Sequence, residues 1–226
     1  MKKTCLLLLL SIFLLSSYAQ KPFAGIIKSK TYVENTTDAN ILSQFPINAE
    51  TTVLNNKVKS EMVMQGLGIT TISDGDKMLN TIILDMTAFG MGSYYKTTPV
   101  DFSKTKVDFT MVKEDTKVIA GYTCYKVVAA ITNLETDDVT TANLYISDDF
   151  MPTFISTQYF GLKGYPLYTS SDMDTGGVTY TVINEITEIK ANKKIKDVDF
   201  LLPASALSFD EAPDEVKAML GDGDED

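Results

Sequence analysis

Few side chains in this sequence could perform nucleophilic or acid–base chemistry. Its 226 residues include no His and no Trp, and all 20 basic residues are Lys. A chain without His lacks the imidazole base of Ser-His-Asp and Cys-His sites, and it lacks the usual zinc ligands. A chain without Arg also lacks the planar fork that binds carboxylate or phosphate through two hydrogen bonds. The remaining candidates are Lys, Asp, Glu, Tyr, Ser, Thr and Cys, and we expect a protein that is not an enzyme and that holds no cofactor or metal.

Two local patterns resemble catalytic motifs, and neither has the required context. Ser103 and Lys106 match S-x-x-K, in which Lys activates Ser across a helical turn. Here the segment runs directly into an alternating strand at Val107, which predicts that the two side chains lie on opposite faces. Asp148 and Asp149 could form the carboxylate pair of a glycosidase, but adjacent residues on a strand point apart. We therefore assign no catalytic residue.

Cys124 is the one cysteine outside the first twenty residues. Its neighbours Tyr122, Thr123, Tyr125 and Val127 are typical of a strand, and no His or helix N-terminus nearby would depress the thiol pKa. We expect a buried, unreactive thiol. A redox-active thiol and an intermolecular disulfide are the alternatives for an unpaired cysteine in an exported protein.

Methionine is concentrated in the first half of the chain, where a flexible, polarisable side chain suits a cavity for varied apolar ligands. Six residues are the candidate lining of such a ligand cavity: Val58, Met62, Met64, Met78, Phe109 and Met111. Ordinary core packing is the alternative. Copper(I) held by thioethers is a second alternative, but without His or a suitable Cys we expect no metal site.

The N-terminus has the layout of a secretory signal peptide. Lys2 and Lys3 precede the apolar run from Cys5 to Leu15, and Ser17-Tyr18-Ala19 offers a cleavage site before Gln20. The apolar run is too short to cross a hydrocarbon core of roughly 30 Å. We therefore predict a signal peptide over residues 1–19 and an exported chain, periplasmic or secreted.

The chain beyond the signal peptide is predicted to be one soluble, acidic domain. Removing Lys2 and Lys3 changes the formal charge from −10 to −12, which repels phosphate backbones and makes nucleic acid an improbable partner. No later segment is apolar over a membrane-spanning length. We assign residues 20–221 to a single domain and residues 222–226 to an acidic, disordered tail.

Alternation with a period of two dominates this domain and predicts strands. From Lys57 to Gln65, apolar positions on one face alternate with largely charged positions on the other, and Lys106 to Val112 alternates in the same way. Residues that favour turns separate the strands, at Asn55-Asn56, Asp74-Gly75, Thr136-Asp137-Asp138 and Gly176-Gly177. The apolar phase slips between Val178 and Lys190, which indicates a bulge or a bend.

Helical signals are few. Asp38 to Phe45 predicts a short helix capped by Asp38, and Pro213 to Leu220 predicts a second helix with acidic residues in its first turn. Ala88 to Tyr95 is rich in Gly and aromatic residues without a pattern, so we interpret it as a loop. Nine or ten strands and two or three short helices predict a mainly β fold, in which a long curved antiparallel sheet forms an unclosed barrel.

Residues Ile119 to Lys126, which read I-A-G-Y-T-C-Y-K, resemble the I-x-G-Y-x-C-x-K signature of small exported domains of unknown function from Gram-negative bacteria. Its signature residues here are Gly121, Tyr122, Cys124 and Lys126, to which we give a structural role. Weaker marks of the same resemblance lie at Phe23–Ile27, Ile72–Lys77, Gly164–Leu167 and Phe200–Pro203. The resemblance implies a fold similar to the periplasmic lipoprotein carrier and its outer-membrane receptor, which hold acyl chains in an unclosed barrel. The carrier uses an Arg near its cavity mouth, and this chain has none.

The signal peptide, the strand pattern, the methionines and the resemblance together favour a non-enzymatic domain of the cell envelope. It would bind an apolar or lipid-like ligand, such as an acyl chain, in a cavity of the sheet. The alternative is an interaction module that recruits an envelope protein and binds no small ligand.

Overall fold

The computed structural model describes residues 23–150, 159 and 161–220. The predicted signal peptide over residues 1–19 and the predicted acidic tail over residues 222–226 lie outside the described residues. The elements, in chain order, are β1 (Ala24–Glu34), α2 (Ala39–Leu42), β2 (Asn48–Leu54), β3 (Lys57–Met64), β4 (Leu67–Asp74), β5 (Leu79–Asp85), η2 (Thr87–Phe89), β6 (Ser93–Pro99), β7 (Thr105–Ile119), β8 (Tyr122–Asn133), β9 (Val139–Ile146), β10 (Pro166–Thr175), β11 (Val178–Ala191), η3 (Asp197–Phe200), β12 (Ala206–Ser208), η4 (Phe209–Glu211) and α3 (Asp214–Leu220).

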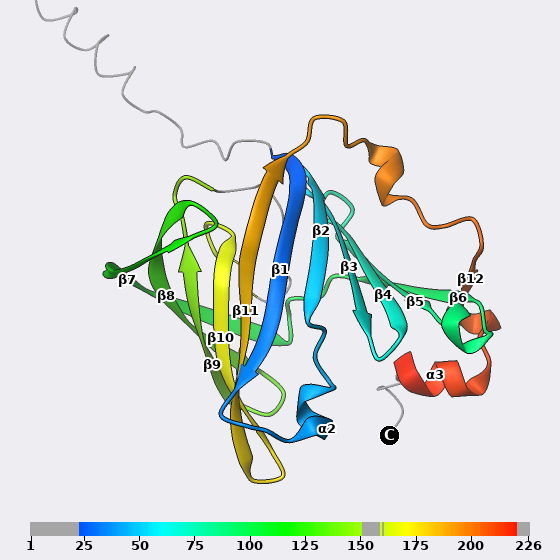
Figure 1. The fold of residues 1–226 in the computed structure, drawn as a ribbon, viewed down its shortest axis with the longest axis horizontal. Helices are drawn as coiled ribbons and strands as arrows, with labels where there is room; N and C mark the ends of the chain where they lie inside the picture. Colours follow the sequence, from blue (N-terminus) through cyan, green and yellow to red (C-terminus); the bar gives the residue numbers. More distant parts are fainter. Residues whose placement is uncertain (1–22, 151–158, 160, 221–226) are drawn as a thin grey trace, which may run out of the picture.

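All strands of the described residues belong to one sheet of twelve, in the order β12-β6-β5-β4-β3-β2-β1-β11-β10-β9-β8-β7. Every neighbouring pair is antiparallel except β12 and β6, which are parallel. The sheet is curved and does not close, because β12 and β7 are its two ends (Figure 1). The predicted fold class is confirmed, and the sheet has more strands than the nine or ten expected.

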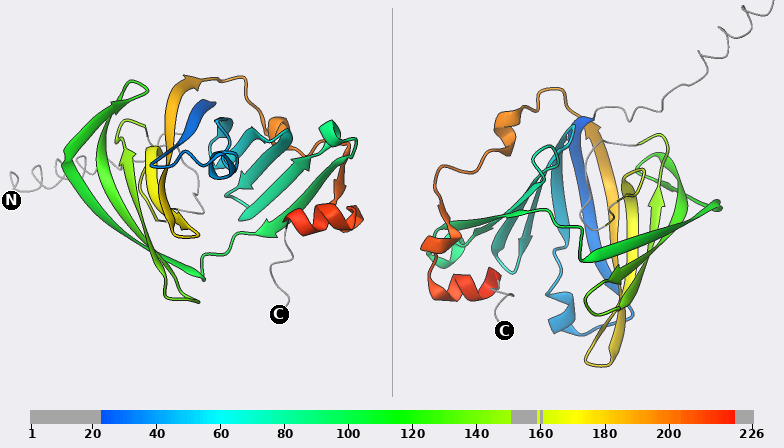
Figure 2. Two further views of the ribbon diagram at one scale, coloured as in Figure 1. Left: turned by 60° about the horizontal axis from the view of Figure 1, so that its bottom comes forward. Right: turned by 180° about the vertical axis from the view of Figure 1, so that it is seen from behind.

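The curvature of the sheet gives it an open side. β6 and β7 follow each other in sequence but lie at opposite ends of the sheet, so the segment between them crosses that open side (Figure 2). Strands β1 to β6 form one meander and β7 to β11 form another, and the pairing of β1 with β11 joins the two.

The predicted turns lie between the expected strands because their residues accept positive φ. Asn55, between β2 and β3, has a φ of 53°, and Asp137, between β8 and β9, has a φ of 60°. Gly176 and Gly177, between β10 and β11, have φ values of 62° and 82°. The Asn55-Asn56 and Gly176-Gly177 turns have two residues and match the right-handed twist of the strands that they connect, whereas five residues join β8 to β9.

Both predicted helices are present, and the predicted loop is wrong in part. The Asp38 side chain accepts a hydrogen bond from the Asn40 N–H and so caps α2. Within Ala88 to Tyr95, however, Ser93 begins β6. Tyr94 packs on one face of the sheet with Phe209, and Tyr95 packs on the other with Phe200, so both faces of β6 carry a packed aromatic side chain and no alternation marks the start of the strand.

The phase slip predicted in β11 is a bulge. Ser29 pairs with Ile186 and Lys28 pairs with Glu188, which leaves Thr187 as the additional residue. Because of this extra residue, Ile186 and Ile189 lie on the same face of the sheet, although they are three positions apart. Both then pack in one core cluster with Ile27.

Strand register divides the side chains between two faces. We call the face that carries Ile27, Val53 and Leu144 the inner face, because it lines the open side of the curved sheet, and we call the opposite one the outer face. Helix α3 and η4 pack on the inner face of β5 and β6 through Phe209 and Val216.

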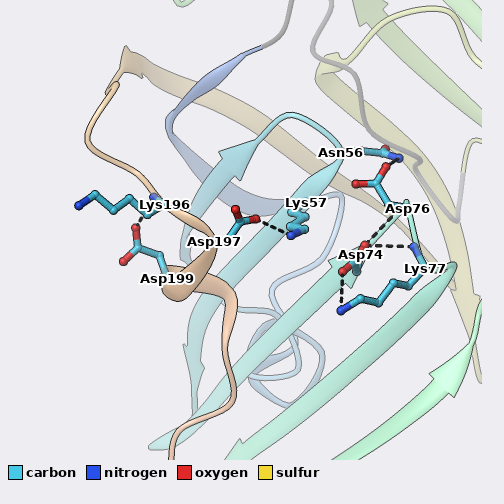
Figure 3. Close-up of polar contacts among 8 residues, drawn as sticks. All are labelled: Asn56, Lys57, Asp74, Asp76, Lys77, Lys196, Asp197 and Asp199. Atoms are coloured by element: carbon cyan, nitrogen blue, oxygen red, sulfur yellow. Dashed lines mark hydrogen bonds and ion pairs between the residues drawn. The ribbon is translucent and has the colours of Figure 1, made fainter.

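A strap that contains η3 covers part of the outer face. Phe200 packs there against Ile72 and Ile83. The Lys57 ammonium forms an ion pair with the Asp197 carboxylate and so fixes η3 to the β2–β3 hairpin (Figure 3). Hydrogen bonding to Asp197 raises the pKa of Lys57, as expected for this contact.

The inner-face core should determine the stability of the fold. Leu144 is fully buried, and Leu144→Ala is expected to lower the free energy of unfolding by about 2–5 kcal/mol, because it leaves a cavity among Val127, Tyr159 and Leu162. Urea unfolding followed by circular dichroism measures this loss. Leu134→Ala is the matched control, since Leu134 is exposed and its truncation should change stability by less than about 0.5 kcal/mol. Equal losses in the two variants would contradict the assigned core.

Candidate functional site

The inner face carries almost no charge. The strand register and the two-residue period assign each strand residue to a face. Among the described residues, no inner-face position of β1 to β5 or of β8 to β11 is occupied by Lys, Asp or Glu. In β6, the inner-face Lys96 places its ammonium 4.9 Å from the centre of the Phe209 ring, beneath η4. Any ligand held on this face therefore meets apolar, hydroxyl and amide groups.

Two grooves lie at the end of the inner face that α2 covers. Groove 1, about 890 Å³, lies between the α2 segment and strands β1 to β4. Its apolar lining residues are Leu42, Phe45, Ile47, Ala49, Met62, Val63, Met64 and Ile69. Leu42 and Ile47 are 42% and 64% exposed, although both are large and apolar. This exposed apolar surface is what a binding groove presents before it is filled.

Charged residues also border groove 1, but the register turns their side chains outward. Lys28, Glu50 and Glu61 are neighbours in one row across β1, β2 and β3, and the adjacent row of Ser29, Ala49 and Met62 faces inward. The Lys28 ammonium pairs with Glu188, 2.9 Å away, and Glu61 pairs with Lys59.

Asp85 marks the outer limit of groove 1. Its Oδ1 accepts hydrogen bonds from the Thr87 hydroxyl, the Thr87 N–H and the Ser93 hydroxyl. These hydrogen bonds lower the pKa of Asp85, so the carboxylate stays ionised and is occupied with holding η2 and the start of β6.

Groove 2, about 430 Å³, has a polar but uncharged floor. Thr31, Asn184 and Thr169 lie side by side on β1, β11 and β10, and the Asn184 Nδ2 donates a hydrogen bond of 3.0 Å to the Thr31 hydroxyl. Ser171 extends this floor along β10. The floor therefore offers hydroxyl and amide groups and no formal charge.

Aromatic side chains form the walls of groove 2. Tyr165 lines it, and burial raises the pKa of this phenol to about 12, so it is neutral. Phe45 lies between the two grooves and lines both, and its ring meets the Tyr180 ring edge-on with centroids 6.1 Å apart. The α2 segment thus separates two neighbouring spaces on one face.

The six residues predicted to line a cavity are only partly brought together. Met62 and Met64 line groove 1, as their strand phase suggests. Val58 and Phe109 pack against two separate core clusters. Met78 occupies the β4–β5 turn with a φ of 55°.

Met111 differs from the expectation in its burial. Met111, on β7, pairs with Val127 on β8, as the alternation implies. It is nevertheless 51% exposed, because β7 is the last strand of the sheet. The side chains of an edge strand have a neighbouring strand on one side only, so they are less buried.

The signature residues sit where β7 turns into β8. Ala120 and Gly121 form the turn, with φ values of 48° and 86°, and the positive φ of Gly121 accounts for glycine there. The Tyr122 ring packs on Phe150 with centroids 5.3 Å apart. The Lys126 ammonium is 3.9 Å from Asp115. Each residue thus has a packing or turn contact in this part of the fold.

The dismissed catalytic patterns are not assembled into a site. Ser103 lies in the turn before β7, and the Lys106 ammonium pairs with Asp108, 2.7 Å away. Over residues 23–150, 159 and 161–220, no cluster of three or more His, Cys, Asp or Glu side chains is arranged to hold a metal ion. No helix in the same residues has the length and apolarity needed to span a membrane.

Sequence reasoning missed the floor of groove 2. Thr31 and Asn184 are 153 residues apart, and only the β1–β11 pairing makes them neighbours. One signal was available in the sequence: uncharged Thr, Ser and Asn alternate with charged residues along β1, β10 and β11. That signal does not indicate which strands pair.

No protein-family model and no curated protein matches the sequence. Solved structures with similar folds include PNGF-II, at 13% identity and a TM-score of 0.51 over 82% of this chain. This chain spans 31% of the length of that chain. This likeness concerns the fold alone.

Two further structures match less closely. A putative outer membrane lipoprotein-sorting protein domain from Vibrio parahaemolyticus matches at 8% identity and a TM-score of 0.36, over 81% of this chain and 92% of its own. A DUF1329 family protein from Desulfovibrio piger matches at 6% identity and a TM-score of 0.27, over 82% of this chain and 92% of its own. Family membership through the I-x-G-Y-x-C-x-K signature stays a prediction.

Cys124 should be unreactive in the folded protein. Its side chain is fully buried, burial raises the pKa of the thiol, and the thiolate is the reactive form. In a chain that begins at Gln20, where Cys124 is the sole cysteine, reaction with Ellman's reagent at pH 8 should be at least about 100-fold slower in buffer than in urea. Comparable rates would show an accessible thiol and reopen a redox role.

Proposed function

We propose that this chain is a binding domain without catalytic activity, which holds an apolar, acyl-chain-like ligand in groove 1 and acts at the cell envelope. The predicted signal peptide supports the location. The observation that carries the proposal is a groove of about 890 Å³ whose inward side chains are mostly apolar and whose lining leaves Leu42 and Ile47 exposed.

The size and lining of groove 1 suit a single alkyl chain. Its volume lies within the range of about 300–1,000 Å³ that is typical of small-molecule sites. Burying each methylene of a chain contributes about 0.8 kcal/mol, so even partial burial of a ten- to twelve-carbon chain favours binding. Met62 and Met64 are unbranched thioethers that adjust to chains of different shape.

The surroundings of the groove support binding rather than catalysis. The charged groups at its border are turned outward or occupied, as Lys28 is with Glu188 and Asp85 is with Thr87 and Ser93. The Cys124 thiol is buried elsewhere, in the cluster that contains Ile119 and Tyr145. Among the described residues, these contacts engage the charged groups at the border of groove 1 and keep the Cys124 thiol away from it.

One observation favours the interaction module as a second function. β7 spans 15 residues at the end of the sheet, and an end strand of this length is a template for strand addition by another chain. The opposite end, β12, has 3 residues. In this alternative a partner strand would pair with β7, and groove 1 would carry no ligand.

A matched set of methionine variants tests the proposed groove. Met62→Gln and Met64→Gln should each weaken binding of a fluorescent dodecyl-chain probe about 10-fold, because each puts an amide against the alkyl chain. Met111→Gln is the control, since Met111 is half exposed on β7 and should leave binding unchanged. Titration of the probe at constant protein concentration measures the three affinities.

Native mass spectrometry of the purified protein provides the independent measurement. Extra mass that organic solvent removes, and that fragmentation identifies as a lipid, would support the proposal. A clean apo mass that no lipid changes, together with equal probe binding by all three variants, would instead favour the interaction module.

A further inference from the structure

We propose that groove 2 binds the head group of the same ligand, and that this head group is an uncharged polyol. The inference rests on the proposed function, since it assigns the polar end of the amphiphile whose chain lies in groove 1. The ligand class is then an acyl chain joined to a hydroxylated neutral group, such as a monoacylglycerol.

The first argument is the chemistry of the groove floor. Thr31, Asn184, Thr169 and Ser171 supply hydroxyl and amide groups, which both donate and accept hydrogen bonds. The hydrogen bond between Asn184 and Thr31 uses one amide donor and fixes the side chain in place. A polyol presents the same kind of group, so each of its hydroxyls can exchange hydrogen bonds with this floor.

The second argument is the charge of the lining. Groove 2 is lined by no Lys, Asp or Glu among the described residues, and the neighbouring charged row of Lys30 and Glu185 faces outward. A carboxylate or an ammonium placed here would lose hydration without gaining a partner of opposite charge, which is costly. A neutral head group avoids that loss.

The third argument is that the two grooves are neighbours. Phe45 lines both, so a ligand that passes around its ring would have its chain on one side and its head group on the other. Phe45 itself is held by its edge contact with Tyr180 and by its position between α2 and Pro46. The aromatic walls formed by Phe45 and Tyr165 also suit the C–H faces of a polyol.

Four probes that share a chain of about twelve carbons separate the head groups: 1-monododecanoylglycerol, methyl dodecanoate, dodecanoate and dodecyltrimethylammonium. Each is titrated below its micelle concentration by competition with the fluorescent dodecyl probe. We expect monododecanoylglycerol to bind at least about 10-fold more tightly than either ion, and also more tightly than the methyl ester, which lacks hydroxyl donors.

Two variants assign the preference to groove 2. Asn184→Leu keeps the size of the side chain and removes its hydrogen bonds. Thr169→Val does the same for a hydroxyl and leaves the hydrogen bond between Asn184 and Thr31 in place. Each should remove most of the preference for monododecanoylglycerol and leave the methyl ester unchanged. Thr110→Val is the control, because Thr110 is exposed on the outer face of β7. Urea unfolding confirms that each variant folds.

The outcomes separate the two proposals. If none of the probes binds, the proposed function fails, and the head-group site fails with it. If the probes bind in groove 1 but the charged ones bind as tightly as monododecanoylglycerol, the proposed function holds and the polyol site is wrong. The polyol site is also wrong if Asn184→Leu and Thr169→Val both keep the full preference.

Discussion

The two-residue period of the strands is the constraint on which the rest of this structure depends. Twelve strands in one sheet give every strand side chain one of two faces, and in β1 to β5 and β8 to β11 the described carboxylates and ammonium groups lie on the outer one. The inner face is then free to combine a packed core with open apolar and hydroxyl surface. A shift of one residue in any pairing would turn a charged row inward, where it would lack partners. The placement of the charged residues therefore disfavours any other strand register.

Lysine alone supplies the positive side of this outer surface, because the chain has no Arg. The Lys117 ammonium lies 4.2 Å from the centre of the Tyr168 ring and 4.6 Å from that of Tyr145, so its charge faces two aromatic rings. Burial raises the pKa of Tyr145 to about 12, and its hydroxyl donates a hydrogen bond to Asp115. Such contacts use point charges and rings where other proteins use the guanidinium fork.

Much of the fold could be predicted from local sequence, because the determining contacts are local. The Asn55 turn and the alternation around Met62 each depend on residues a few positions apart, and so the β2–β3–β4 meander could be foreseen. β6 could not be foreseen, since Tyr94 and Tyr95 pack on opposite faces against segments more than 100 residues later. The parallel pairing of β12 with β6 has no local signal at all.

The candidate site, like the fold, was predictable only where strand phase alone places a residue. Met62 and Met64 reach groove 1 through strand phase alone, whereas the exposure of Met111 depends on β7 being the last strand. The position of a strand within the sheet is a property of the whole topology. The alignment of Thr31 with Asn184 and Thr169 likewise requires three strands from the two ends of the chain.

The pairing of β1 with β11 has a consequence for the order of folding. β1 cannot gain its second neighbour until the chain has extended to Ala191, because that neighbour is β11. The first meander can form early, because short hairpins connect its strands. One edge of β1 stays unpaired until about 150 further residues have been synthesised. Contacts so distant in sequence make folding slow, since the loop must close before the pairing stabilises it. A nascent chain of this topology stays incomplete until almost its last strand emerges, and in that interval β1 presents an unpaired strand edge.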